Sequence, residues 1–125
     1  MGTLRLSFLG IWVLLSASSC SVLMMSMTPT QVHETLPTLT ESTYMTIQEG
    51  DSAQEAGICS YLVRDREYYA PVGVTPKNDL KNGAIGIDEW VALDGGNAYA
   101  LKGFEWQSYD EGTQLVVVFH TMKCR

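Results

Sequence analysis

Residues 115–119 read Leu-Val-Val-Val-Phe, an apolar run inside the β-prone stretch Gln114–Lys123. Successive side chains of a strand point to opposite sides of a sheet, so a run that is apolar at every position predicts a central strand. Such a strand is covered on both faces, or by the helix on one face and by aromatic side chains on the other. The segment Ala98–Trp106 precedes this run and is joined to it by the turn-prone sequence Asp110–Thr113. We therefore expect the two segments to pair as a hairpin, with the apolar run as a central strand.

An amphipathic helix is expected just before this hairpin. Thr75-Pro76 is a typical helix start, because the threonine side chain accepts from first-turn N–H groups and proline at the first position needs no donor. Apolar side chains then recur at the helical period: Leu80, Ala84, Ile87 and Val91. Gly83 and Gly86 weaken the helix in isolation, so packing on a sheet must hold it, and their small size allows a close approach. Gly95-Gly96 is expected to end it.

Two strands are expected before this helix. Thr43–Gln48 is a short β-prone stretch broken by Glu49–Ser52, and Gly57–Val63 is a stronger strand candidate. The charged run Arg64–Glu67 is interpreted as a solvated loop, and Tyr68–Val74 as irregular. The order of elements predicts an α+β fold: a small β-α-β-β sandwich over residues 43–125, with one helix packed on a mostly antiparallel sheet.

The first 20 residues have the pattern of an export signal. Arg5 is followed by Leu6–Leu15, which carries no ionisable side chain, and then by Ser16–Ser19 and Cys20. This arrangement resembles the lipobox of bacterial lipoproteins. The resemblance implies that residues 1–19 are a signal peptide and that Cys20 carries the acyl groups, palmitate among them. Ser21 follows the cysteine instead of aspartate, which in Gram-negative lipoproteins implies the outer membrane, with the domain facing the periplasm.

Two other interpretations of this segment stay open. The first is an ordinary cleaved secretory peptide in which Cys20 is incidental. The second is an uncleaved transmembrane helix of about 20 residues, because Val22–Met25 continues the apolar stretch. We favour the lipid anchor over both.

Residues 20–42 are interpreted as the lipidated anchor and a tether. From Ser26 to Ser42 the chain has five threonines and two prolines but no sustained helical or strand period. This composition indicates an extended, solvated segment that supplies reach. His33 and Glu34 lie within it and are expected to be exposed and without function.

Cys59 and Cys124 remain as a pair once Cys20 is lipidated. In an oxidising compartment such a pair is expected to form a disulfide. Closing that loop would contribute roughly 4 kcal/mol of stability in the chain-entropy model, a large share for so small a domain. A metal site is disfavoured because neither cysteine has a second ligand at suitable spacing. His120, four residues before Cys124, would lie about 13 Å from it along a strand.

The charge balance disfavours nucleic acid as a partner. Eight Lys and Arg against 14 Asp and Glu give a net charge of −6, so the basic surface that nucleic-acid binding requires is missing. Asp88, Glu89 and Asp94 are interpreted as solvated helix-surface carboxylates, not as an acid–base pair. Ser60 and Ser108 have no nucleophile signature around them. No phosphate loop, zinc signature or dinucleotide fingerprint occurs in the sequence, so we expect no cofactor, no metal and no small-molecule substrate.

Aromatic side chains are the remaining candidates for an interaction surface. Trp106 and Tyr109 lie beside the expected hairpin turn and are proposed as binding residues, although aromatic residues also build small cores. Trp90 is expected in the core.

The chain resembles the small outer-membrane lipoproteins related to RcsF, of the Rcs envelope-stress pathway. The resemblance spans residues 57–125 and lies in four features: Gly57–Leu62 with its early cysteine, Asp79–Ala84, Gly95–Leu101, and Lys123-Cys124. It does not extend to the second domain disulfide of RcsF or to its basic tether. The resemblance implies a non-enzymatic lipoprotein that binds another envelope protein in stress sensing or assembly. The alternative is an inhibitor or immunity lipoprotein that blocks a cell-envelope hydrolase or toxin, to which an acidic domain is suited.

Overall fold

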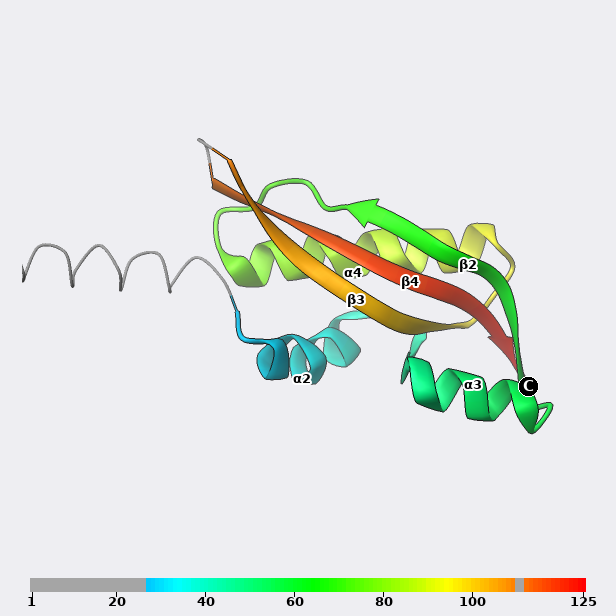
Figure 1. Cartoon of the computed structure of the whole chain (residues 1–125). Helices are drawn as coiled ribbons and strands as arrows, with labels where there is room; N and C mark the ends of the chain where they lie inside the picture. Colours follow the sequence, from blue (N-terminus) through cyan, green and yellow to red (C-terminus); the bar gives the residue numbers. More distant parts are fainter. Residues whose placement is uncertain (1–26, 110–111) are drawn as a thin grey trace, which may run out of the picture.

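The structure, a computed structural model, describes residues 27–109 and 112–125. The described chain has the expected α+β fold, with one four-stranded sheet and helices packed on it (Figure 1). Three helices are described where the sequence predicted one. The elements run in this order: α2 (Pro29–Leu39), β1 (Thr43–Thr46), α3 (Ile47–Glu55), β2 (Cys59–Tyr69), α4 (Pro76–Leu93), β3 (Ala98–Tyr109) and β4 (Gly112–Cys124). Among these residues, no helix is both long and apolar enough to cross a membrane.

The sheet has the strand order β1-β3-β4-β2 and is mostly antiparallel. β3 and β4 form the predicted hairpin, with a register that runs from Ala98 opposite Met122 to Tyr109 opposite Gly112. β2 pairs antiparallel with the other side of β4, and the short β1 pairs parallel with the start of β3. The run 115–119 therefore lies in a central strand, as predicted. Helices cover it on one face only: Leu115, Val117 and Phe119 pack into the main core, whereas Val116 and Val118 lie on the other face, away from any described helix, so the expected cover on both faces is wrong there.

α2 and α4 cover one face of the sheet and form the main core with it. The four stripe residues predicted for α4 are all buried there: Leu80, Ala84, Ile87 and Val91. α4 begins after Thr75, whose hydroxyl accepts from the N–H of Asn78, and Gly95 follows its end with a φ of 80°. The predicted close approach is confirmed at Gly86, where an added methyl carbon would overlap the ring of Tyr68 on β2.

The expected extended tether is wrong for residues 29–39, which form α2. Thr28 and Gln31 make a capping box, and Pro29 occupies the first helical turn, where its missing N–H costs nothing. Val32 and Leu36, one helical turn apart, are fully buried in the main core. The folded unit therefore begins well before residue 43, because these two side chains gain burial that an extended tether would not provide.

Residues 47–55 form the helix α3, where the sequence suggested the end of a strand and a turn. Thr46 and Glu49 make a second capping box, which starts the helix directly after β1. α3 packs on the other face of the sheet at the end where β2 begins (Figure 1). Gly50 allows this contact, since a side chain there would meet the Tyr61 hydroxyl at 2.9 Å and Ala100 at 3.1 Å.

The charged run 64–67 lies in strand β2, not in the solvated loop that was expected. β2 is an edge strand with irregular register against β4 between Tyr61 and Arg66, and Asp65 has a positive φ of 57°. An edge strand tolerates charged side chains, because one side of it meets water, and such bulges also discourage pairing with other chains. Tyr68 and Tyr69, expected to be irregular, continue this strand.

The predicted disulfide between Cys59 and Cys124 is present, with an S–S distance of 2.06 Å. The two cysteines lie opposite each other in the register of β2 and β4. The bond therefore links the first residue of the edge strand to the last residue of the central strand, beside α3.

Candidate functional site

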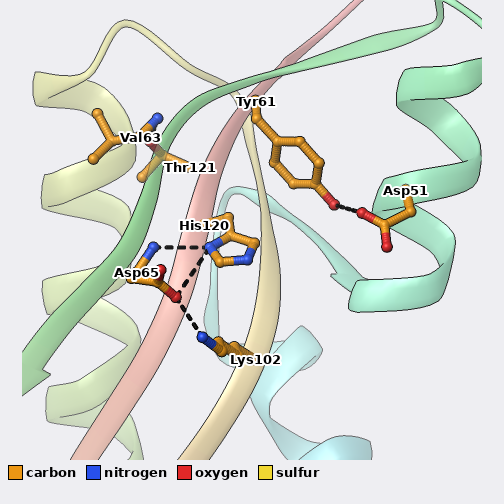
Figure 2. A network of polar contacts seen from close by, with 7 residues as sticks. All are labelled: Asp51, Tyr61, Val63, Asp65, Lys102, His120 and Thr121. Atoms are coloured by element: carbon orange, nitrogen blue, oxygen red, sulfur yellow. Dashed lines mark hydrogen bonds and ion pairs between the residues drawn. The ribbon is translucent and has the colours of Figure 1, made fainter.

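A network of polar side chains lies on the second face of the sheet, beside α3 (Figure 2). His120 comes from β4, Tyr61 and Asp65 from β2, Lys102 from β3 and Asp51 from α3. His120 and Met122 are two residues apart in β4 and so share a face, and Met122 packs in the cluster under α3. The sheet register thus gathers five side chains that are distant in sequence.

His120 is the buried centre of this network, with 6% of its surface exposed. Its Nδ1 atom accepts a hydrogen bond of 2.9 Å from the backbone N–H of Asp65, which puts the proton of the neutral ring on Nε2. The edge of the Tyr61 ring packs against it, with 5.3 Å between ring centroids. Burial lowers the pKa of His120, an effect that the nearby carboxylate of Asp65 opposes. The imidazole is therefore neutral at pH 7.

Asp65 and Lys102 form an ion pair at the outer side of the network. The Lys102 Nζ atom lies 2.6 Å from Asp65 Oδ1, and both side chains are more than half exposed. The hydrogen bond from Lys102 lowers the pKa of the Asp65 carboxyl. Because water screens this exposed ion pair, the pair contributes little stability. It does keep the Asp65 carboxylate in place, with its Oδ1 atom 4.0 Å from His120 Nδ1.

Tyr61 connects the sheet to α3. Its hydroxyl donates to the carboxylate of Asp51 at 2.6 Å, and its backbone N–H donates to Gln54 Oε1 at 3.1 Å. Burial and the Asp51 carboxylate raise the pKa of Tyr61 to about 12, so the hydroxyl stays protonated and acts as a donor. The guanidinium of Arg64 lies 4.2 Å from the centre of the same ring. These contacts give Tyr61 a fixed position between α3 and the edge strand.

Asp94, considered above as one of three helix-surface carboxylates, is engaged by two partners on the first face. Arg66 donates to both of its oxygens, at 2.7 and 3.1 Å, and the Thr121 hydroxyl donates at 2.8 Å. The hydrogen bond from Arg66 lowers the pKa of the Asp94 carboxyl. Asp88 likewise accepts from the backbone N–H groups of Glu41 and Ser42, at 2.9 and 3.0 Å. Both carboxylates therefore join elements of the fold, while Glu89 is exposed on α4.

The two aromatic binding candidates differ in their surroundings. Trp106 is partly buried against the main core, on the face covered by α2 and α4, and its indole Nε1 is buried with no hydrogen-bond partner among the described residues. Tyr109 is the last residue of β3, and the placement of its side chain lies outside what the structure describes, as does Cys20. Ser60 and Ser108 are exposed strand residues.

α3 covers only the disulfide end of the second face. The rest of that face, here called the open face, is formed by Glu67, Tyr69, Gly103, Glu105, Val116 and Val118, which the register brings together. Their neighbours Tyr68, Phe104 and Val117 pack into the main core, so these residues point the other way. A methyl carbon placed on Gly103 would meet no other atom within 4 Å, and Glu67, Tyr69 and Glu105 are exposed. No helix of the described residues covers this surface, although Val116, which lies between Tyr69 and Glu105 in the register, is only 5% exposed.

Comparison with known proteins provides no relative for this chain: no protein-family model matches it, and neither does any curated protein or solved structure. No group of three or more potential metal ligands occurs among residues 27–109 and 112–125. The His120 network holds α3 and three strands together, and next to it lies the open face, which is partly apolar and partly acidic.

Proposed function

We propose that the chain is an envelope lipoprotein whose folded domain binds another protein through the open face. The observation that carries this proposal is the part of the sheet that no helix of the described residues covers. Val118 and Gly103 lie side by side there, and the exposed Glu67 and Glu105 flank them. A rigid sheet with an apolar centre and a polar rim has the general anatomy of a protein interface. The disulfide and the His120 network keep this surface in one shape, which lowers the entropic cost of binding.

The charges on this surface favour a basic partner. Glu67 and Glu105 are both exposed on the open face, and the whole chain carries a net charge of −6. Complementary charge on the partner would speed association and exclude other acidic proteins. The same acidity supports the second candidate function, an inhibitor or immunity lipoprotein that covers a basic hydrolase or toxin.

Action by binding, without catalysis, is part of the proposal. Three groups near the site that could transfer protons have other partners in the fold: His120 accepts from Asp65, Tyr61 donates to Asp51, and Asp94 accepts from Arg66 and Thr121. Each of these contacts joins two elements, which is a structural use of an ionisable group. Stress sensing or assembly at the outer membrane is the role that the resemblance to the RcsF-related lipoproteins implies.

A photo-crosslinking amino acid placed at Glu105 tests the open face directly. The matched control is the same amino acid at Glu89, which is also an exposed glutamate but lies on α4, on the other side of the sheet. We expect a discrete crosslinked product in intact cells from position 105, absent from position 89 and lost in a Glu67→Arg background. Equal products from both positions, or products unaffected by Glu67→Arg, would exclude the open face as the binding surface.

The protein captured from position 105 separates the two candidate functions. An outer-membrane barrel or a signalling protein supports a regulatory or assembly role. A hydrolase or toxin that this chain inhibits in a purified assay supports the inhibitor.

A further inference from the structure

The end of the domain where the described chain begins also carries an exposed apolar loop. α2 and α4 both start at this end, next to the loop that follows β2, whereas the C-terminus and α3 lie at the opposite end (Figure 1). The arrangement is fixed by contacts: Ala70 donates its N–H to Leu115, and Leu115, Leu80, Trp106 and Met27 belong to one packed group.

The loop presents its aliphatic side chains to solvent. Val74 is 94% exposed and Val72 is 51% exposed. Lys77 and Lys81, on the first turns of α4, are exposed beside them. Exposed valines followed by lysines are typical of a surface that meets the interfacial region of a lipid bilayer, where apolar groups bury and lysines extend toward headgroups.

Hydrogen bonds hold the loop in this conformation. Asp79, which is almost fully buried, accepts from the backbone N–H of Gly73, and Asn82 donates to the carbonyl of Pro71 at 3.0 Å. Gln114 of β4 donates to the carbonyl of Ala70 at 3.1 Å. The valines are thus held outward by a fixed backbone, although burying them against the core would be favourable.

The chain leaves little distance between this end and the anchor. Because α2 occupies residues 29–39, the tether expected over residues 26–42 is mostly helix, and Met27 already packs on the core. Met27 is seven positions after Cys20, and seven residue steps span at most about 25 Å when fully extended. A domain anchored at Cys20 therefore lies close to the bilayer, with the end that bears Met27 toward it.

We propose that this end of the domain, the loop 70–74 with Lys77 and Lys81, rests on the lipid surface and inserts Val72 and Val74 into its interfacial region. This inference rests on the membrane anchoring in the proposed function. The contact fixes the orientation of the domain, so that the open face on the side of the sheet stays accessible to a partner. The ligand is the bilayer itself, recognised through apolar insertion and lysine contacts with lipid phosphates.

The test uses the full-length, anchored protein in vesicles of phosphatidylethanolamine and phosphatidylcholine. These zwitterionic lipids are chosen because an anionic surface would repel a chain whose net charge is −6. An environment-sensitive fluorophore is attached to Val74→Cys in one variant and to Leu93→Cys in the other. Leu93 is the matched control, since it is 76% exposed but lies at the far end of α4, about 27 Å along the helix. Labelling requires that Cys20 is acylated and Cys59 and Cys124 are bonded, which intact mass verifies.

We expect the probe at position 74 to shift its emission to the blue on vesicles and to be quenched by nitroxide-labelled lipid. The probe at position 93 should remain accessible to iodide in water. If the protein sediments with vesicles but both probes stay water-exposed, the lipid contact is wrong while the anchor stands. If the chain carries no acyl group and does not sediment with vesicles, the proposed anchoring itself is wrong. Protection of position 74 only in cell envelopes, not on vesicles, would assign the loop to a protein and overturn the lipid contact.

Discussion

At the scale of single residues, the imidazole of His120 couples the fold to pH. Burial lowers its pKa in the folded state, and its Nδ1 atom must remain unprotonated to accept from Asp65. A histidine in the unfolded chain titrates near 6.5. As pH falls through 6.5, the unfolded state therefore binds the proton first, and the folded state loses relative stability.

We predict that the free energy of unfolding is highest above pH 6.5 and declines as the pH falls from 6.5 to 5. The variant His120→Asn should remove most of this decline, because the asparagine oxygen can accept from Asp65 but does not titrate. Urea unfolding followed at several pH values measures the effect. Asp65 and Asp94 do not interfere, since the pKa of each is lowered below 3.8, so that their contribution is lost only at more acidic pH. An undiminished decline in the variant would contradict this role of His120.

Two glycines of α4, Gly86 and Gly83, allow a matched comparison of how much stability an added methyl group costs. Gly86→Ala should destabilise the domain by about 1–3 kcal/mol, because the new methyl group overlaps the rigid ring of Tyr68 and this outweighs the gain in helix propensity. In Gly83→Ala the methyl group would lie 3.1 Å from Leu115 Cδ2, the end of a flexible side chain, so the two effects nearly cancel. Thermal unfolding should show a clear drop in Tm for Gly86→Ala alone. Equal Tm values for the two variants would exclude the close helix–sheet contact at Gly86.

At the scale of elements, α2 belongs to the core. Leu36→Ala should cost about 2–5 kcal/mol, the usual range when a fully buried leucine is truncated. Glu34→Ala, exposed two residues earlier on the same helix, should change stability by less than about 0.5 kcal/mol. Urea unfolding of both variants measures the difference. If both unfold like the unaltered protein, residues 29–39 behave as a tether after all.

The elements that could be predicted from sequence are those with strong local patterns. α4 combines a cap with a stripe of four apolar residues over about three turns, and the hairpin combines an apolar run with a turn, so each pattern specifies its own structure. α2 has only Val32 and Leu36 as buried apolar residues and contains Pro37, so its periodicity is short. Its capping box, Thr28 with Gln31, and that of α3, Thr46 with Glu49, were the readable signals for both helices.

The polar network could not be predicted because the pairing of three strands creates it. Positions 65, 102 and 120 meet only after β2 and β3 have each taken their register on β4, with irregularities near Asp65 and Lys102. No spacing in the sequence carries that information. The charged run 64–67 was misassigned for the same reason, since its strand character depends on pairing with β4.

At the scale of the whole molecule, the disulfide joins two residues that are far apart in the chain. Cys59 and Cys124 are 65 residues apart, and β2, α4, β3 and β4 all lie in the loop they close. Replacing both cysteines with alanine should lower the free energy of unfolding by about 4 kcal/mol in the chain-entropy model. Urea unfolding of Cys59→Ala/Cys124→Ala against the oxidised protein provides the value. A midpoint that does not change would show that the packed sheet alone maintains this end of the domain.

Membrane anchoring is the claim on which the proposed function and orientation both depend. The most direct measurement is the intact mass of the protein extracted from membranes, with and without reduction, compared with that of Cys20→Ala. We predict a mature chain that begins at Cys20 and carries acyl groups, and a mass gain of two hydrogens on reduction of the Cys59–Cys124 bond. An unmodified mass, identical in processing to Cys20→Ala, would contradict the lipoprotein function and remove the basis for a membrane-facing loop.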